Sequence, residues 1–216
     1  MNALNQVTHE EHGMPPCLGG FEHVNRYWDP VNQTWAAKIL PGEYYVSVHD
    51  ELITTVLGSC ISVCIRDKVR GIGGMNHFML PSNDDRDSSW NEKVNSATRY
   101  GNHAMEHLIN DILKVGGNRR DLEAKMFGGG HVLKIELNIG GKNADFARHY
   151  LAREGLNLVA EDVEGKDPRK IQFYPRSGRA RVKKLRKVNN NTIAQREQQY
   201  FRNIERVRPH TDVELF

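Results

Sequence analysis

The segment TTVLGSCISVCIRDKVRGIGGMNHFMLP, residues 54–81, carries the clearest strand pattern of the chain. Two β-rich segments, 53–57 and 61–66, are separated by a Gly-Ser-Cys turn. Runs of β-branched and apolar residues that end at turn residues are typical of strands. The next segment, 71–80, carries three glycines ahead of His77, which suits a strand that another backbone approaches closely. We therefore expect neighbouring strands with a cysteine at the turn between the first two.

Helices interrupt further strands in the middle of the chain. Apolar residues recur every three or four positions over 95–115, which predicts a helix that ends at a Gly-Gly pair. A second helix is expected over 143–154. The other expected strands lie at 44–48, 122–127, 156–163, 170–175 and 180–185. The pattern predicts an α/β (α+β) domain of packed sheets flanked by helices, covering 41–187.

The two ends of the chain differ from this domain in composition. Residues 1–40 show no helical or strand period, which predicts a partly extended N-terminal arm whose aromatic residues dock in places on the domain. Residues 188–216 predict a polar, helical tail with a thin apolar stripe. We expect such a helix to pack weakly on the domain or to bind a partner protein.

Composition indicates the class of protein. Hydrophobic residues make up 38% of the chain and charged residues 26%, as in ordinary globular proteins. The N-terminus lacks the features of a secretory signal, and no apolar run could span a bilayer, so we expect a cytoplasmic protein. Its three cysteines suggest no disulfide framework.

The charge of the chain is unevenly distributed. The net charge is +3, yet residues 176–216 carry eleven Lys/Arg against four Asp/Glu, or +7. Residues 176–187 hold seven of these basic side chains. Such a run suits an anionic partner, which makes a nucleic-acid-binding protein an alternative function. The run has no interleaved aromatic residues for stacking bases, and an acidic protein surface fits the charges equally well.

Cys60 allows three interpretations. It could be a small buried core residue, which is the better interpretation of Cys64 among its aliphatic neighbours. It could be a metal ligand together with Cys64, His77 and His131, although the spacing lacks the paired ligands of zinc sites. Finally, it could be a nucleophile, because a thiol at a backbone kink lies beside exposed N–H groups that would stabilise an oxyanion.

The nucleophile interpretation requires a base. His77 lies on a separate predicted strand, from which it could deprotonate Cys60 and later protonate a leaving amine. A third group must orient the imidazole, and a threonine hydroxyl from Thr54 or Thr55 could do so. The sequence pattern leaves the choice between these two residues open.

These segments resemble the CheD family of bacterial chemoreceptor glutamine deamidases. The resemblance covers about residues 42–186, in order, and rests on the motifs TTVLGSCISVCIRD, GIGGMNHFMLP, ATRYGNHAMEHLI, AKMFGGG and IQFYPRSGRARVKKL. It implies a protein-glutamine deamidase with a Cys-His-Thr triad, in which the threonine lies six positions before the cysteine. Carried over, the triad is Cys60, His77 and Thr54, and no metal or cofactor is required.

The resemblance also implies a fold and partners. The fold would be similar to the catalytic domain of cytotoxic necrotizing factor toxins. The substrates would be glutamines on the cytoplasmic helices of methyl-accepting chemotaxis receptors, and a CheC-type phosphatase is a further expected partner. No nucleic acid and no membrane insertion are expected. The alternative within chemotaxis is an adaptor whose chief task is to bind the phosphatase.

Overall fold

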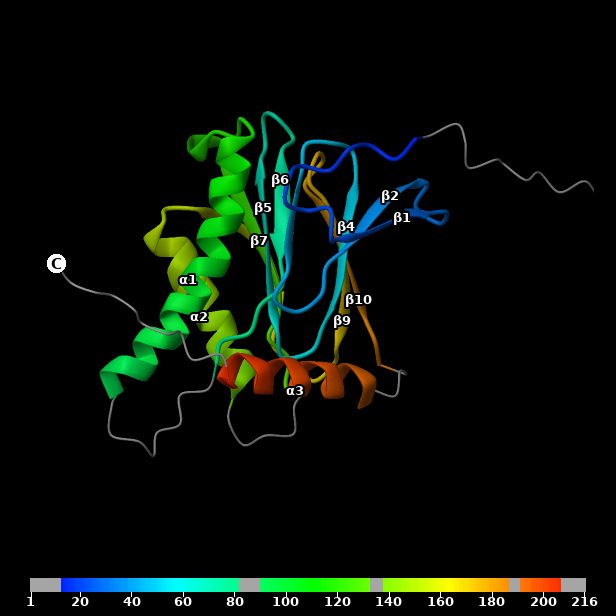
Figure 1. Ribbon diagram of the computed structural model, residues 1–216. Helices are drawn as coiled ribbons and strands as arrows, with labels where there is room; N and C mark the ends of the chain where they lie inside the picture. Colours follow the sequence, from blue (N-terminus) through cyan, green and yellow to red (C-terminus); the bar gives the residue numbers. More distant parts are fainter. Residues whose placement is uncertain (1–12, 82–89, 133–137, 187–190, 207–216) are drawn as a thin grey trace, which may run out of the picture.

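The computed structural model describes residues 13–81, 90–132, 138–186 and 191–206 (Figure 1). These residues form two mixed five-stranded sheets and three α-helices, as the sequence pattern predicted in outline. None of the described helices has the length and apolar composition needed to cross a membrane.

Each sheet joins strands that are distant in sequence. The first sheet has the order β1-β2-β4-β9-β10, with β1 Asn25–Asp29, β2 Thr34–Lys38, β4 Leu52–Leu57, β9 Arg169–Tyr174 and β10 Arg179–Lys184. The second has the order β3-β6-β5-β7-β8, with β3 Tyr44–Ser47, β6 Gly73–Asn76, β5 Ile61–Asp67, β7 Leu122–Gly128 and β8 Asn157–Val163. The β2–β4 and β7–β8 pairs are parallel and all others antiparallel. Consecutive strands β4 and β5 thus belong to different sheets.

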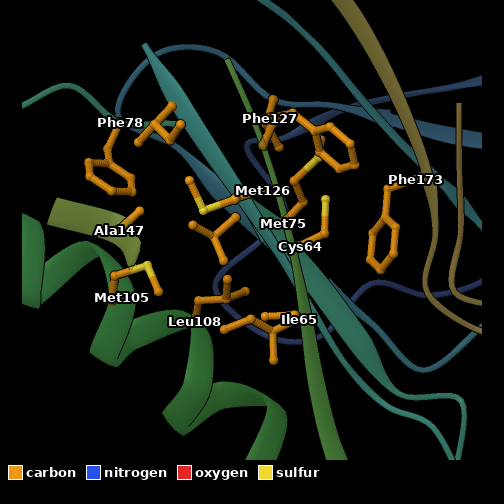
Figure 2. Close-up of a cluster of buried hydrophobic side chains, with 14 of the residues drawn as sticks. Cys64, Ile65, Met75, Phe78, Met105, Leu108, Met126, Phe127, Ala147 and Phe173 are labelled. Atoms are coloured by element: carbon orange, nitrogen blue, oxygen red, sulfur yellow. The ribbon is translucent and has the colours of Figure 1, made fainter. Parts of the chain in front are cut away.

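The main core fills the space between the two sheets and between the second sheet and its helices. Helices α1 (Trp90–Lys114) and α2 (Ile139–Arg153) cover the outer face of the second sheet (Figure 1). Side chains alternate along β5, so that Cys64 lies on the side of Phe173 while Ile65 lies on the side of α1 (Figure 2). Cys64 is therefore a buried core residue, as its aliphatic neighbours predicted.

The third helix, α3 (Asn191–Arg206), lies across one end of the strands (Figure 1). The sequence predicted a helix here, and the structure adds its location. Phe201 is buried in the main core, and the partly buried side chains of Tyr200 and Ile204 pack against it. The apolar stripe expected in the tail therefore faces the domain.

The structure corrects the expectation for the N-terminal arm. Strands β1 and β2 form an antiparallel hairpin, and β2 pairs with β4. The partly extended arm predicted over residues 1–40 was expected to contain no strand, which was wrong for this part, because short strands broken by a Pro-containing turn show little periodicity. Residues 1–12 of the arm lie outside the described residues. The hairpin is fastened by Arg26, which forms a buried ion pair with Glu51. Glu51 also accepts hydrogen bonds from Tyr45 and Ser47.

We predict that Glu51→Ala destabilises the whole domain. The substitution leaves the Arg26 guanidinium buried without its counter-ion, which costs about 3–5 kcal/mol of unfolding free energy. Urea denaturation of wild type and variant measures this loss. The control is Lys114→Ala, which removes an exposed ion pair with Asp111 and should cost under about 1 kcal/mol. Equal stabilities for the two variants would contradict the role given to Arg26 and Glu51.

Candidate active site

Cys60 lies in the turn that carries the chain from one sheet to the other. Gly58, Ser59 and Cys60 connect β4 to β5, and the Cys60 side chain is fully buried. The glycine loop after β7 supports this turn: Gly129 N–H donates to the Cys60 carbonyl at 2.7 Å, and Gly130 N–H donates to the Gly58 carbonyl at 2.7 Å. The turn is thereby fixed from one side.

The glycine loop approaches this turn too closely for side chains. A Cβ atom at Gly128, whose φ is +111°, would lie 2.2 Å from the Cys60 carbonyl oxygen. A Cβ at Gly140, in α2, would lie 2.3 Å from the Gly129 carbonyl oxygen. The glycines therefore serve close backbone packing around the cysteine.

Asn143 fixes the turn from a second side. This fully buried residue of α2 donates from Nδ2 to the Ser59 carbonyl at 2.9 Å, while its Oδ1 accepts from the Leu80 N–H at 2.9 Å. From the sequence, Asn143 was expected only as the start of a helix. The sequence offered one signal of its buried role: Asn143 is a polar residue on the same helix face as Ala144 and Ala147, which are both buried.

His77 is held at the end of β6 by its backbone and its ring. Its N–H donates to the Glu43 carbonyl, and its carbonyl accepts from the Gly42 N–H. The ring Nδ1 lies 2.8 Å from the Thr55 hydroxyl oxygen, and this hydroxyl also lies 2.8 Å from the Ile39 carbonyl oxygen. A carbonyl can only accept, so the single hydroxyl proton goes to Ile39 and Nδ1 must be the donor to Thr55. The lone pair of the neutral ring is therefore on Nε2.

The structure thus places Thr55 on the histidine, whereas the resemblance assigned Thr54. Side chains alternate along β4, so the two threonines face opposite sides of the first sheet. Thr55 faces the main core, and the Thr54 hydroxyl donates to the Ile171 carbonyl at 2.8 Å. The expected contact between Thr54 and His77 is absent, and Thr55 makes it instead.

A third side chain completes the cluster around Cys60 and His77. The sulfur of Cys60, a ring nitrogen of His77 and a carboxylate oxygen of Glu197 all lie within 4.8 Å of one another, and all three residues are buried. Among the residues that the structure describes, none hydrogen bonds to Nε2 of His77. The imidazole ring, with Nε2 unpaired among these residues, therefore lies in the same cluster as the thiol.

Glu197 comes from α3 and shows where the backbone N–H groups of the turn point. Its Oε1 accepts from the N–H groups of Gly58 at 2.7 Å and Cys60 at 3.2 Å, and its Oε2 accepts from Ser59 N–H at 2.6 Å. We call these three N–H groups the amide nest. Three converging donors beside a cysteine form an oxyanion-binding site. Such N–H groups were expected from the sequence. Glu197 was not predicted as a site residue, because the neighbouring residues of this helix are also polar and no pattern distinguished it from them.

In this conformation both members of the Cys-His pair are neutral. Burial, followed by the charge of Glu197 and a hydrogen bond to it, raises the pKa of Cys60 well above its usual value. Burial, followed by the charge of Arg196, lowers the pKa of His77 to about 3. The thiol is thus protonated while α3 covers it.

The metal interpretation finds only part of its ligand set here. Cys60 and His77 lie together with Glu197, whereas Cys64 is in the core and His131 is exposed, outside this cluster. The spacing of the three donors would suit a metal ion, but both carboxylate oxygens of Glu197 already accept backbone hydrogen bonds. The hydrogen bonding therefore favours an oxyanion-binding site.

We predict that His77 makes the stability of the protein sensitive to acid. The histidine pKa falls from 6.5 in the unfolded chain to about 3 in the native protein. Between these values the unfolded state binds more protons, so the contribution is complete above the unfolded pKa and is lost as the pH falls. From about pH 7 to about pH 5, wild type should lose about 2 kcal/mol more unfolding free energy than His77→Gln. Denaturant titrations at both pH values measure this difference, and parallel losses would contradict it.

Comparison with known proteins shows to which family the chain belongs. The family model described as "CheD chemotactic sensory transduction" matches residues 79–184. A protein of Halorhodospira halophila is 52% identical over 94% of this chain and 94% of its own length. One of Herminiimonas arsenicoxydans is 53% identical over 89% of this chain and 95% of its own, and one of Hahella chejuensis is 45% identical over 99% and 100%. Each carries the description "Probable chemoreceptor glutamine deamidase CheD".

Solved structures add little to this comparison. The crystal structure of Bacillus licheniformis hypothetical protein YfiH matches 57% of this chain and 50% of its own with 13% identity and a TM-score of 0.36, too low to define a shared fold. The expected likeness to cytotoxic necrotizing factor toxins stays a prediction. The family itself is established by relatives about half identical over nearly the whole length: the chain belongs to the CheD family.

Proposed function

We propose that this chain is a chemoreceptor glutamine deamidase, which converts glutamine side chains of chemotaxis receptors to glutamate with release of ammonia. The observation that carries the proposal is the amide nest, which already binds a glutamate carboxylate beside Cys60 and His77. Family membership supports the same activity, because the relatives are described as chemoreceptor glutamine deamidases.

The geometry supports a mechanism by acyl transfer to sulfur. Nε2 of His77 takes the proton of Cys60, and the thiolate attacks the carboxamide carbon of the substrate glutamine. The amide nest holds the oxygen that becomes negative, and each such donor is typically worth about 10²–10³ in rate. His77 then protonates the departing ammonia, and a water molecule that it activates cleaves the thioester to leave glutamate. Thr55 acts as a positioning residue, since it keeps the ring proton on Nδ1.

The partners follow from the activity. We propose that the substrates are the cytoplasmic helices of methyl-accepting chemotaxis receptors, which requires a cytoplasmic location for this protein. A CheC-type phosphatase remains a proposed partner. On β10 the basic side chains of Arg179, Arg181 and Lys183 are exposed, and Arg179 and Arg181 lie over the ring of Tyr174. This basic face suits acidic receptor helices by charge alone.

We predict that Cys60→Ala abolishes deamidation and that His77→Gln is nearly as damaging. The first removes the nucleophile and the second its base, so each should lose about 10³-fold or more in rate. The measurement is peptide mass spectrometry on a receptor cytoplasmic fragment after incubation with each protein, which also identifies the converted glutamines. Cys64→Ala, in the core on the adjoining strand β5, is the matched control and should keep its activity if it folds.

Full activity in Cys60→Ala would contradict the mechanism. If neither wild type nor variant converts glutamine while both bind the fragment, the adaptor alternative is favoured. Salt-dependent binding of random oligonucleotides that does not need Cys60 would favour the nucleic-acid alternative.

We predict that Thr55→Ala harms activity more than Thr54→Ala. Loss of the Thr55 hydroxyl frees the ring of His77 to rotate and change tautomer, which should lower kcat about 10- to 100-fold. The Thr54 hydroxyl donates to the Ile171 carbonyl on the other face of β4, away from His77, so its removal should leave kcat within about threefold if the domain stays folded. Thr55→Ser, which keeps the hydroxyl, should restore most of the rate. A larger loss from Thr54→Ala would favour the residue that the family resemblance assigns.

A further inference from the structure

The site described above is closed by the chain itself. Cys60 and His77 are 0% and 2% exposed, and Glu197 of α3, itself 1% exposed, lies against both of them. A receptor glutamine cannot reach a thiol with no exposed surface. For the proposed reaction to occur, α3 must leave its position.

The group that α3 places in the site has the chemical structure of the reaction product. Deamidation of a glutamine side chain yields a glutamate side chain, and the side chain in the amide nest is a glutamate. One of its oxygens lies where the nest would bind the carbonyl oxygen of a substrate. The Cys60 thiol is hydrogen bonded to the same carboxylate, so Glu197 contacts the group that would attack a substrate.

The helix is held by one narrow face. Phe201 is buried in the main core, and the Tyr200 ring packs on Gly42 so closely that a Cβ there would lie 3.1 Å from it. The hydroxyl groups of Tyr200 and Tyr100 are hydrogen bonded. A Cβ at Gly58 would lie 2.5 Å from the Glu197 carboxylate, so this glycine leaves room for it. The opposite face of α3 is exposed, with Gln195, Arg196, Gln198, Gln199, Arg202 and Asn203.

Docking of α3 has a free-energy cost, and this cost limits how tightly the helix is bound to the domain. The carboxylate is withdrawn from water, and burial raises the pKa of Glu197 even though three amide hydrogen bonds oppose the shift. Few of the described side chains of α3 are buried with it. A helix held in this way can be displaced by another helix that offers similar contacts.

We propose that α3 is an intramolecular product mimic: it occupies the groove into which the substrate helix binds, presents Glu197 to the amide nest, and keeps the enzyme inactive until it is displaced. This inference rests on the proposed deamidase function. It also defines what the groove binds: a helix that carries the reacting side chain. In that helix, aromatic residues would follow the reacting residue by three and four positions, as Tyr200 and Phe201 follow Glu197.

The proposal predicts an additional reaction. In a Glu197→Gln protein the mimic becomes a substrate within the same chain. The Cys60 sulfur forms a bond to the Cδ atom of the amide side chain at position 197 as the Cδ–N bond breaks, His77 supplies the proton that releases ammonia, and water then cleaves the thioester. The products are ammonia and a glutamate at position 197, which restores the wild-type sequence.

The first experiment follows this self-deamidation by mass spectrometry. Residues 197–202 follow Arg196 and end at Arg202, so trypsin releases them as one peptide. Glu197→Gln should show conversion of amide to acid at position 197, with a rate independent of protein concentration. Gln198 and Gln199, on the exposed face, should stay unchanged and serve as controls within the same peptide.

The matched control is the double variant Glu197→Gln with Cys60→Ala, which should keep its amide. An amide that persists at position 197 of a folded Glu197→Gln protein able to deamidate receptor fragments would overturn the product mimic. Conversion that proceeds equally without Cys60 would overturn it as well.

The second experiment measures access to the thiol and does not depend on deamidation. Glu197→Ala removes the carboxylate, and Tyr200→Ala loosens α3 without touching the nest. Each should raise the alkylation rate of Cys60 by iodoacetamide at least about tenfold. Glu197→Ala removes the charge-assisted hydrogen bonds to the nest, and Tyr200→Ala removes a neutral hydrogen bond together with the packing of its ring on Gly42. Gln198→Ala, on the exposed face, should label at the wild-type rate.

The two experiments separate the failure of this proposal from the failure of the proposed function. Unchanged labelling, together with Cys60-dependent receptor deamidation that Glu197→Ala does not accelerate, would overturn the mimic and leave the deamidase intact. Faster labelling without any glutamine conversion would overturn the deamidase and with it the product mimic, while showing that α3 covers the thiol.

Discussion

Three backbone N–H groups of the turn between β4 and β5 converge on one point, where they donate to a single carboxylate. Peptide N–H groups that are buried without an acceptor are costly, so a turn that aims several of them inward needs support and a partner. Here the support comes from two directions, from the glycine loop after β7 and from Asn143 of α2. The partner is Glu197.

The two-sheet arrangement explains how a cysteine and a histidine distant in sequence come together. Because β4 and β5 belong to different sheets, the turn between them lies at the edge of the space between the sheets. His77 follows β6, which pairs with β5 in the second sheet, whereas Thr55 is on β4 in the first sheet. The hydrogen bond between Thr55 and His77 therefore joins the two sheets, and it fixes the ring only if their packing is intact.

Much of the architecture could be predicted from the sequence, and the reasons for the misses are physical. The strand around Cys64 and the helix that ends just before Gly116 carry strong local patterns, and both are where they were expected. The hairpin at β1 and β2 was missed because its strands gain their stability from pairing with β4, which leaves little mark on local composition. Cys60 and His77 were predicted as nucleophile and base from a kink and a neighbouring strand, and the structure brings these two residues together. The choice between Thr54 and Thr55 depended on which face of β4 turns inward, and short apolar runs do not reveal that.

The burial of Cys60 under α3 has a consequence for the durability of the protein. Oxidation of cysteine begins from an accessible thiolate and ends, beyond the sulfenic acid, in forms that cells seldom repair. A thiol that is covered and protonated is a poor target for peroxide. The helix that excludes substrates thus also protects the Cys60 thiol from oxidation. Cys60 is exposed to oxidants only while the site is open for catalysis.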